Sequence, residues 1–420
     1  MKSKFFISFV VCCLGIVRCY SQNIIPIHDY EVNLENDAVN KYMNEVEYNP
    51  HDKSVIDNYR KGLGYRGDWP NPVVIDIPEN NVDSLYVICC DDITLKDSLS
   101  FHISTEKNTA ELYNLIPNRS YRYQIKYDED ILQQGKIYTK GQLRQIKVCN
   151  EVSNIRDLGG WKTADNRQIR YGKIIRGTEL NGNHIATKEG IDILLGIGIG
   201  AELDLRAWYN EGSNTSAFGF SSSSYQGRVP SFYYSSNSGQ LPSHMTENTW
   251  QIKWCQEFRF ILNNIRQGRT IYEHCVYGKD RTGFLSFLLE GLLGVEYNDL
   301  VKEYELTFFS NSKESTKDSI DKVFDYIETM EGETLRDKFN TYFTDYISVN
   351  QAEIDEFRYL MLDGDGDDGD NKFDWGKTAV AVIDIFNYIV GKDKDIPEEE
   401  VDVNEDNTVN VADIVKLIIK

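Results

Sequence analysis

The sequence predicts a multidomain protein with an N-terminal β-sandwich, a central α/β domain and a small all-α module built on a calcium-binding loop. Three observations support this division. Short β-prone segments separated by turn-forming residues occupy 67–147, strands alternate with helices over 148–361, and acidic residues recur at fixed spacing within 362–420. The preceding segment, 22–66, is polar and weakly periodic, and we interpret it as an irregular leader or as a short helix near 37–45.

The composition indicates a folded protein and restricts its partners. The 420 residues include 26 Tyr and 19 Phe, which is more aromatic content than a disordered chain carries. The formal net charge is −21, and so acidic a chain is repelled by nucleic acid and by anionic membrane surfaces. We therefore expect no nucleic-acid partner, and any site for an anion must be a local positive pocket.

The first residues, 1–21, have the features of an export signal. Lys2 and Lys4 precede an apolar run over 5–17, and the residues before Gln22 suit cleavage. A transmembrane anchor is the alternative, but an apolar run of about 13 residues is shorter than a membrane span. We expect an exported protein that is periplasmic, at the cell surface or secreted.

The cysteine count indicates a free thiol. Three of the eight cysteines lie within the predicted signal, which leaves five. An odd number in an exported protein leaves at least one thiol unpaired. The remaining five are Cys89, Cys90, Cys149, Cys255 and Cys275.

The region 67–147 is expected to consist of strands joined by turns. Its β-prone segments lie at 72–77, 84–89, 99–103, 115–125 and 136–138. Within this region, Leu115-x-Pro117-x3-Tyr121-x-Tyr123 resembles the strand corner of fibronectin type III domains. This resemblance implies a small β-sandwich.

The central region alternates strands with helices, which predicts a partly parallel sheet. A strand over 172–176 is followed by a helix over 186–195 with Thr187 as its N-cap, and then by a strand over 201–206. A further strand, loop and helix are expected over 271–289. The strand over 201–206 ends in charged residues, as catalytic edges of α/β sheets often do.

Residues that can carry chemistry are concentrated in the loop before a helix that begins near Arg281. The loop reads His274-Cys275-Val276-Tyr277-Gly278-Lys279-Asp280-Arg281-Thr282. Such a loop directs successive backbone N–H groups and the positive end of a helix dipole at one point, where a phosphate would bind. Cys275 would there be a thiolate nucleophile. An inert core cysteine is the alternative, but five matching residue types at fixed spacing rarely arise by chance.

This loop resembles the His-Cys-x2-Gly-x2-Arg-Ser/Thr signature of the cysteine-dependent phosphatases. Together with Asn154-x-Arg156-Asp157-Leu158-Gly159-Gly160 and Asp204-Leu205-Arg206, it is similar to the bacterial tyrosine-protein phosphatase family over about 149–361. The resemblance implies a central cysteine-phosphatase domain that needs no cofactor for catalysis. It also implies a phosphorylated substrate: phosphotyrosine, phosphoserine or phosphothreonine in a protein, or a phosphoinositide.

The resemblance assigns catalytic roles residue by residue. Cys275 would form a phosphocysteine, Arg281 would hold two phosphate oxygens through its planar fork, Thr282 would hydrogen-bond the sulfur, and His274 would orient the loop. The residues expected to bind substrate are Val276, Tyr277, Gly278, Lys279, Arg156, Asp157, Asp204 and Arg206. Two alternatives stay open, an inositol-phosphate phosphatase of the same fold and a non-catalytic phosphate-binding or scaffolding protein.

The motif does not identify the general acid, because no aspartate lies between Asp204 and Asp280. Many relatives carry their acid there. Asp280 is the first candidate, since it lies within the loop as in the similar arrangement of the myotubularin lipid phosphatases. The alternatives are Asp204, Glu211 and Glu247. The Ser-, Gly- and Asn-rich segment 212–247 is either a lid or a solvated loop. Glu273 is expected to face solvent.

The acidic C-terminal segment is expected to bind Ca²⁺. Oxygen-bearing side chains recur at the spacing of a calcium loop just before a short helix over 414–419. The predicted ligands are Asp402, Asn404, Asp406, Thr408 and Asp413, with Asn410 between the last two. Aspartate at the final position resembles a type I dockerin repeat, which implies a cohesin-like protein as a partner. A weaker copy of the repeat lies upstream.

Overall fold

The structure, a computed structural model, describes residues 25–52, 55–63, 67–78, 84–91, 99–104, 108–128, 130–206, 215–229, 245–310, 317–364 and 409. They belong to two compact units. The smaller unit comprises the residues up to Tyr30 together with 75–110 and 120–138. The larger unit comprises 31–74, 111–119 and the chain from Thr139 onward.

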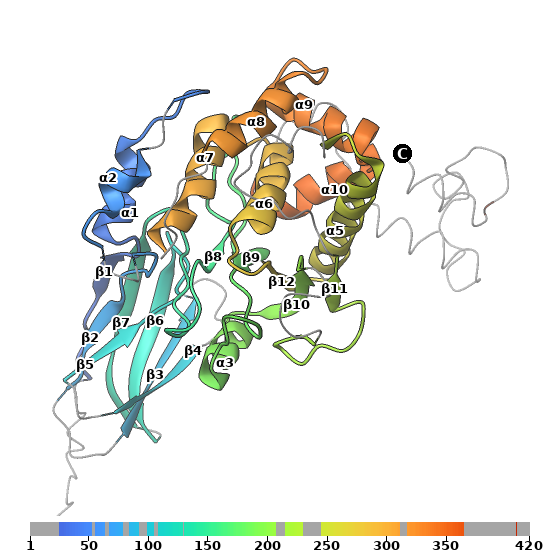
Figure 1. The fold of residues 1–420 in the computed structure, drawn as a ribbon. Coiled ribbons are helices and arrows are strands. Elements are labelled where there is room, and N and C mark those ends of the chain that lie inside the picture. Colours follow the sequence, from blue (N-terminus) through green and yellow to red (C-terminus); the bar gives the residue numbers. More distant parts are fainter. Residues whose placement is uncertain are drawn as a thin grey trace, which may run out of the picture. The chain divides into compact units, whose positions relative to one another are not determined.

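Strands dominate the first third of the described chain and helices the last third (Figure 1). In chain order the elements are β1 (Tyr30–Asn33), α1 (Asp37–Glu45), α2 (Ile56–Arg60), β2 (Val73–Asp76), β3 (Ser84–Asp91), β4 (Leu99–Ser104), β5 (Thr109–Leu112), β6 (Ser120–Tyr127), β7 (Asp130–Lys140), β8 (Arg156–Asp157), β9 (Ile174–Gly177), α3 (Lys188–Gly196), β10 (Ile199–Asp204), β11 (Gln226–Arg228), α5 (Asn248–Arg266), β12 (Thr270–His274), α6 (Asp280–Leu293), α7 (Tyr297–Glu305), the 3₁₀ turn η1 (Leu306–Phe309), α8 (Lys317–Glu328), α9 (Leu335–Thr341), the π-helical turn η2 (Tyr342–Tyr346) and α10 (Gln351–Met361).

The smaller unit contains an antiparallel sheet. Strand β3 pairs with β4 on one side and β6 on the other, and β6 pairs with β7. On β6 the buried residues alternate with more exposed ones, and Tyr121, Tyr123 and Ile125 point to the same buried face. Strands expected near 84–89, 99–103 and 136–138 are therefore confirmed. The fibronectin-like sandwich stays a prediction.

The segment 22–66 contributes β1, α1 and α2, of which the two helices lie in the larger unit. The helix expected near 37–45 is present as α1, capped by the Asn36 side chain, which accepts a hydrogen bond from the Val39 N–H. Val39 and Tyr42 are fully buried in the main hydrophobic core, and the Tyr42 hydroxyl donates to Glu305 on α7. This part of the predicted leader is therefore integral to the core of the larger unit.

A five-stranded sheet in the order β11-β10-β12-β9-β8 organises the larger unit. Pairings from β11 to β9 are parallel and β8 is antiparallel, which confirms the predicted partly parallel sheet. Successive residues point to opposite faces. Ile174 and Ile271 lie in the core with α5 and α6, whereas Ile175 and Tyr272 lie in a second cluster with α3 on the other face (Figure 1).

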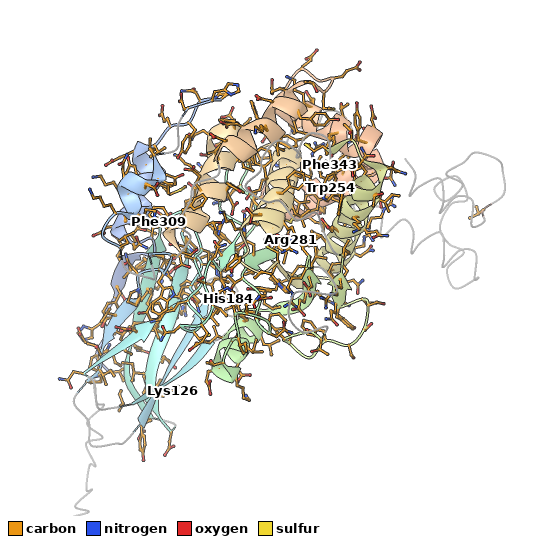
Figure 2. All side chains as sticks on the ribbon, in the orientation of Figure 1. Lys126, His184, Trp254, Arg281, Phe309 and Phe343 are labelled. Carbon is orange, nitrogen blue, oxygen red and sulfur yellow. The ribbon has the colours of Figure 1, made fainter. Side chains whose placement is uncertain are left out.

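Helix α6 lies at the centre of the helical layer. All its residues after the first are buried, and it contacts α7, α9 and α10. Figure 2 shows Trp254 and Phe343 among these helices and Arg281 nearer the sheet. Because α6 is covered on all sides, its N-terminus is held rigidly at the carboxyl end of the central strand β12. Among the described helices, none is both long and apolar enough to cross a membrane.

Candidate active site

The loop between β12 and α6 is the centre of the candidate site. Strand β12 ends at His274 and α6 begins at Asp280, so the predicted strand, loop and helix are confirmed. Cys275 and Arg281, at the two ends of the loop, each have 3% of their surface exposed. We call residues 275–281 the phosphate loop. The N-terminus of α6 adds the positive end of its dipole at this place.

The backbone carbonyls of the phosphate loop are held by groups outside it. The Cys275 carbonyl lies 3.2 Å from Nδ1 of His274, and the Val276 carbonyl accepts the Glu179 N–H at 3.1 Å. The side-chain amide of Asn154 donates to the carbonyls of Tyr277 and Gly278, both at 3.0 Å. In a trans peptide the N–H points away from the carbonyl. The four following N–H groups, from residues 276 to 279, are therefore directed away from these anchors.

Gly278 is required by the shape of the loop. Its φ is +62°, and a Cβ placed on it would lie 2.3 Å from the Gly177 carbonyl oxygen. A side chain here would be strained in its backbone conformation and would also separate the phosphate loop from the end of β9. The glycine therefore allows the loop to pack directly on a neighbouring strand.

Arg281 is fixed to the end of β10. Its Nη1 donates to the Leu205 carbonyl at 3.2 Å, which orients the guanidinium near the start of α6. Thr282 follows on α6 and is fully buried, and its hydroxyl has no hydrogen-bond partner among the described residues. A buried hydroxyl without a partner is costly, so this group is available to a ligand or to a modified cysteine.

His274 is buried between two acceptors. Its Nε2 lies 3.0 Å from Glu202 Oε1 and its Nδ1 faces the Cys275 carbonyl. Burial alone would lower the pKa of His274, but Asp204 and Glu202 outweigh it and raise that pKa. Both ring nitrogens can donate only in the imidazolium form, so these surroundings favour the charged ring beside Cys275.

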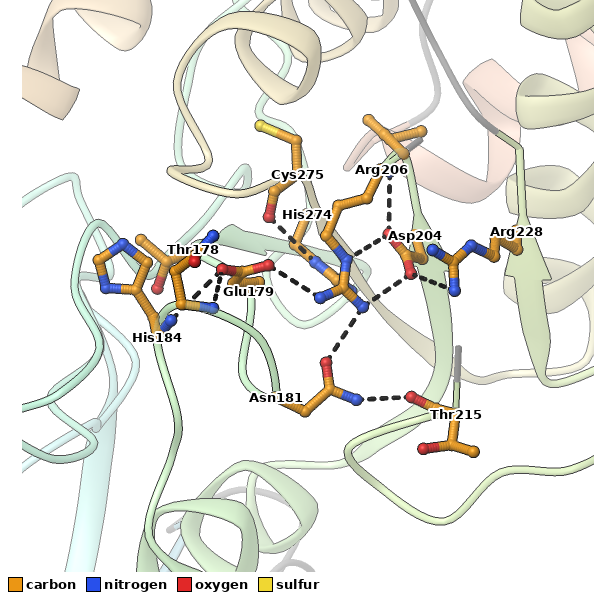
Figure 3. Close-up of polar contacts among 12 residues, drawn as sticks. Thr178, Glu179, Asn181, His184, Asp204, Arg206, Thr215, Arg228, His274 and Cys275 are labelled. Atoms are coloured by element: carbon orange, nitrogen blue, oxygen red, sulfur yellow. Dashed lines mark hydrogen bonds and ion pairs between the residues drawn. The ribbon is translucent and has the colours of Figure 1, made fainter. Parts of the chain in front are cut away.

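Arg206 is the centre of a network that supports the first half of the loop (Figure 3). It donates to both oxygens of Asp204, to Glu179 Oε2 at 2.8 Å and to Asn181 at 3.0 Å. Glu179 in turn donates its N–H to the Val276 carbonyl. The network thus fixes the segment that holds this carbonyl.

Comparison with known sequences identifies the family. Residues 148–363, just over half of the chain, match the profile of the tyrosine phosphatase family. The chain belongs to this family. A protein of Cupriavidus necator named "Putative tyrosine-protein phosphatase" is 28% identical in an alignment over 176 residues, and the match covers 39% of this chain and 63% of that protein. The chain thus spans less than two thirds of the curated relative it matches.

In this tyrosine phosphatase family member, four predicted substrate ligands are buried and bonded to other protein groups. Arg156 is buried and bonded to Glu303, Asn154 and Thr307. Asp157 pairs with Arg144 at 3.3 Å and accepts the N–H groups of Gly159 and Gly172. Asp204 and Arg206 are fully buried against each other. All four are thus held by protein groups, and their contact with substrate stays a prediction.

The candidates for the general acid can be ranked by their surroundings. Burial would raise the pKa of Asp204, but His274 and Arg206 outweigh it and lower that pKa, which makes Asp204 a poor proton donor. For Asp280, burial outweighs the neighbouring cations and raises the pKa. Glu247 precedes α5 as its N-cap residue. Glu211 lies outside the described residues.

Glu273 corrects one expectation. It is completely buried and accepts a hydrogen bond from Ser286 at 2.7 Å, so the prediction that it faces solvent is wrong. The reason is that β12 is a central parallel strand, covered on both faces. Burial is also the main cause that raises the pKa of Glu273 to about 7.

Sequence reasoning missed the residues that hold the loop from behind. Asn154 was named only as part of a family motif and Arg176 only as part of a strand, and Glu179 and Glu303 were given no role. Asn154 has φ +58°, a conformation that asparagine tolerates better than most residues. A polar residue two positions before the charged pair Arg156-Asp157 was the available signal. Nothing local marks Glu303, because its partners are more than 120 residues away.

Proposed function

We propose that this protein is a phosphomonoesterase, specifically a protein-tyrosine phosphatase that acts through a phosphocysteine at Cys275. The observation that carries the proposal is the geometry of the phosphate loop. Its four successive carbonyls, from Cys275 to Gly278, are anchored on the side opposite to the predicted phosphate position. The N–H groups of residues 276–279 and the Arg281 guanidinium can donate hydrogen bonds to a phosphate dianion beside the buried Cys275. The positive end of the α6 dipole adds a favourable potential at the same place.

In the proposed reaction the Cys275 thiolate attacks phosphorus in line with the leaving oxygen. A sulfur–phosphorus bond forms as the phosphorus–oxygen bond of the ester breaks, and the leaving oxygen takes a proton from a general acid. Water then attacks phosphorus, and the thiolate leaves with a hydrogen bond from Thr282. Arg281 and the loop N–H groups stabilise the charge on the equatorial oxygens in both steps.

Asp280 is the acid we propose. Its pKa is raised by burial, so it retains a proton closer to neutral pH than an exposed aspartate does. Replacement Asp280→Asn should lower kcat for p-nitrophenyl phosphate less than for phenyl phosphate, because the more basic phenolate depends more on protonation. It should also remove the alkaline limb of the kcat–pH profile. An unchanged profile would rule Asp280 out.

Turnover of p-nitrophenyl phosphate tests the proposal directly. Cys275→Ser should abolish turnover while binding of inorganic phosphate is retained. Cys255→Ser is the matched control, because Cys255 is also a buried free cysteine but lies on α5 near Ser348. Wild-type protein that is folded and hydrolyses no phosphomonoester would refute the proposal. Equal loss in both variants would refute the assignment of Cys275.

Substrate specificity is part of the proposal and needs its own measurement. Phosphotyrosine peptide should be hydrolysed with a higher kcat/KM than phosphoserine peptide or inositol phosphates. A preference for inositol phosphates would favour the alternative substrate class, for which Lys279 within the loop would supply additional charge. Phosphate binding with no turnover of any of them would favour the scaffolding alternative.

We also propose that the protein is exported and that its C-terminal segment binds Ca²⁺ and a cohesin-like partner. The predicted signal and the ligands Asp402, Asn404, Asp406, Thr408 and Asp413 lie outside the described residues. Asp402→Ala combined with Asp413→Ala should remove any calcium-dependent rise in Tm of the full chain. A calcium response that persists in this variant would contradict the assigned loop.

A further inference from the structure

We propose that Arg176 is a positioning residue of the phosphate loop, which sets the orientation of the Gly278–Lys279 peptide by bonding its carbonyl and a buried carboxylate on α7 at the same time. The proposal rests on the phosphate-binding role of the loop stated above. It assigns to Arg176 no contact with substrate.

Two bonds from one guanidinium carry this inference. Arg176 lies on β9 and is fully buried. Its Nη2 donates to the Gly278 carbonyl at 2.6 Å and its Nη1 donates to Glu303 Oε2 at 2.6 Å. Because the guanidinium is planar and rigid, fixing one donor on Glu303 also fixes the direction of the other.

The two bonds belong to a closed circuit of side chains. Glu303 Oε1 accepts from Arg156 Nε at 2.7 Å, and Arg156 Nη1 donates to Asn154 Oδ1. The Asn154 amide then donates to the Gly278 carbonyl, the same oxygen that Arg176 bonds. Every member therefore holds its neighbour, and the Gly278 carbonyl is bonded from two directions.

This circuit determines where the loop N–H groups point. With the carbonyls of Tyr277 and Gly278 directed into the circuit, the N–H groups of Gly278 and Lys279 point to the opposite side. Rotation of either peptide would break one or two charge-assisted or amide hydrogen bonds in a buried environment. The donors are thus oriented before an oxyanion arrives, which is the condition for effective stabilisation of developing charge.

Arg176→Lys tests the proposal. Lysine retains the charge but loses the planar fork, so it cannot orient two acceptors in the same way. In a Cys275→Ser background, the Kd for inorganic phosphate measured by calorimetry should rise about 10- to 100-fold, the usual range for supporting residues around a site. In the otherwise unmodified chain, kcat for p-nitrophenyl phosphate should fall by a similar factor.

Arg144→Lys is the matched control. Arg144 also bridges a buried carboxylate, Asp157, and a backbone carbonyl, that of Asn114. It does not touch the phosphate loop through any bond described. Arg144→Lys should lower Tm about as much as Arg176→Lys does. It should change the phosphate Kd less than about twofold, which is the usual size of the effect of a remote substitution.

A second variant protects the test against misfolding. Asn154→Gly keeps the positive φ of this position while removing the amide that bonds the Tyr277 and Gly278 carbonyls. It should raise the phosphate Kd at least about fivefold, in line with the loss of supporting hydrogen bonds. If Arg176→Lys or Asn154→Gly folds in the Cys275→Ser background and binds phosphate as tightly as the Cys275→Ser parent does, the positioning role is overturned. Phosphate binding that depends on Arg176 in a protein without turnover would instead overturn only the proposed function.

Discussion

Two buried networks of charged residues support the two halves of the phosphate loop, and they are balanced differently. Arg206 supports the first half, through Glu179 and the Val276 carbonyl. Arg176 supports the second half, through the Gly278 carbonyl. Each network places at least two ionised side chains in the interior, where an unpaired charge costs several kcal/mol.

The Arg206 network is matched in charge and in hydrogen bonds. Arg206 faces two carboxylates, Asp204 and Glu179, and Arg228 lies 3.7 Å from Asp204. Burial alone would lower the pKa of Arg206, but these carboxylates raise it, and the pKa of Asp204 is lowered. The ionised forms of Arg206 and Asp204 are therefore favoured.

The Arg176 network contains more carboxyl groups than its two arginines can pair. Glu303 forms ion pairs with both Arg156 and Arg176. Among the described residues, the nearby carboxyl groups of Glu273 and Glu290 form no ion pair with either arginine. Neither oxygen of Glu290 has a partner in the described part of the chain. Burial and the nearby Glu303 carboxylate raise the pKa of Glu290 well above its usual range. These surroundings favour the neutral form of the Glu290 carboxyl in the folded protein.

The pKa of a cation in this network is also shifted. Burial and the neighbouring Arg176 lower the pKa of Arg156 to about 10. The pKa shifts of Asp204 and Arg206 thus favour charged side chains in the matched network, whereas the crowded network contains Glu273, whose pKa burial raises to about 7. The following predictions test that difference.

The largest effect is expected at Glu303. Glu303→Gln removes the carboxylate shared by two buried arginines and should destabilise the protein by about 3–5 kcal/mol, the usual cost of breaking a buried ion pair. Glu179→Gln is the comparison, because its single arginine keeps Asp204. Urea unfolding should show a larger loss for Glu303→Gln, and equal losses would mean that the two networks do not differ.

A pH-dependent effect is expected at Glu273, whose pKa burial raises to about 7. Since the unfolded pKa is about 4.3, ionisation costs the folded state nothing below that value and the full amount above about pH 7. Glu273→Gln keeps an acceptor for Ser286 and removes this cost. Its free energy of unfolding relative to wild type should therefore rise by about 3 kcal/mol between pH 4 and pH 8. A difference that does not change with pH would contradict the raised pKa.

A smaller loss of stability is expected for Asp204→Asn in the Arg206 network. Arg206 keeps Glu179 and Asn181, so the protein should lose about 2 kcal/mol, the value of hydrogen bonds to a charged group. Because Asp204 helps to raise the pKa of His274, that pKa should fall in the variant. NMR titration of His274 measures it. An unchanged histidine pKa would show that Glu202 alone determines it.

The smallest effect is expected at Glu290. If its carboxyl is neutral, Glu290→Gln replaces one uncharged polar group by another, and stability should change by less than about 1 kcal/mol from pH 5 to pH 8. Thermal melts across this range provide the measurement. A gain that grows with pH would show that the wild-type carboxyl ionises within the range.

Local sequence signals indicated the tyrosine phosphatase family and much of the secondary structure. The spacing from His274 to Thr282 predicted a strand, a loop and a helix, all of which are present. Thr187 was expected as an N-cap and accepts the Gly190 N–H. The acidic C-terminal loop stays a prediction, since it lies outside the described residues.

The sequence by itself thus determined which residues can form a phosphate site, because a turn, a cap and a loop depend on neighbours within a few residues. Only the tertiary structure decided how that loop is held. Arg176 meets Gly278 and Glu303 across 102 and 127 residues of sequence, and Arg156 meets the same Glu303 across 147. No periodic pattern encodes such pairings, because they depend on which strand ends a parallel sheet brings beside α6 and α7.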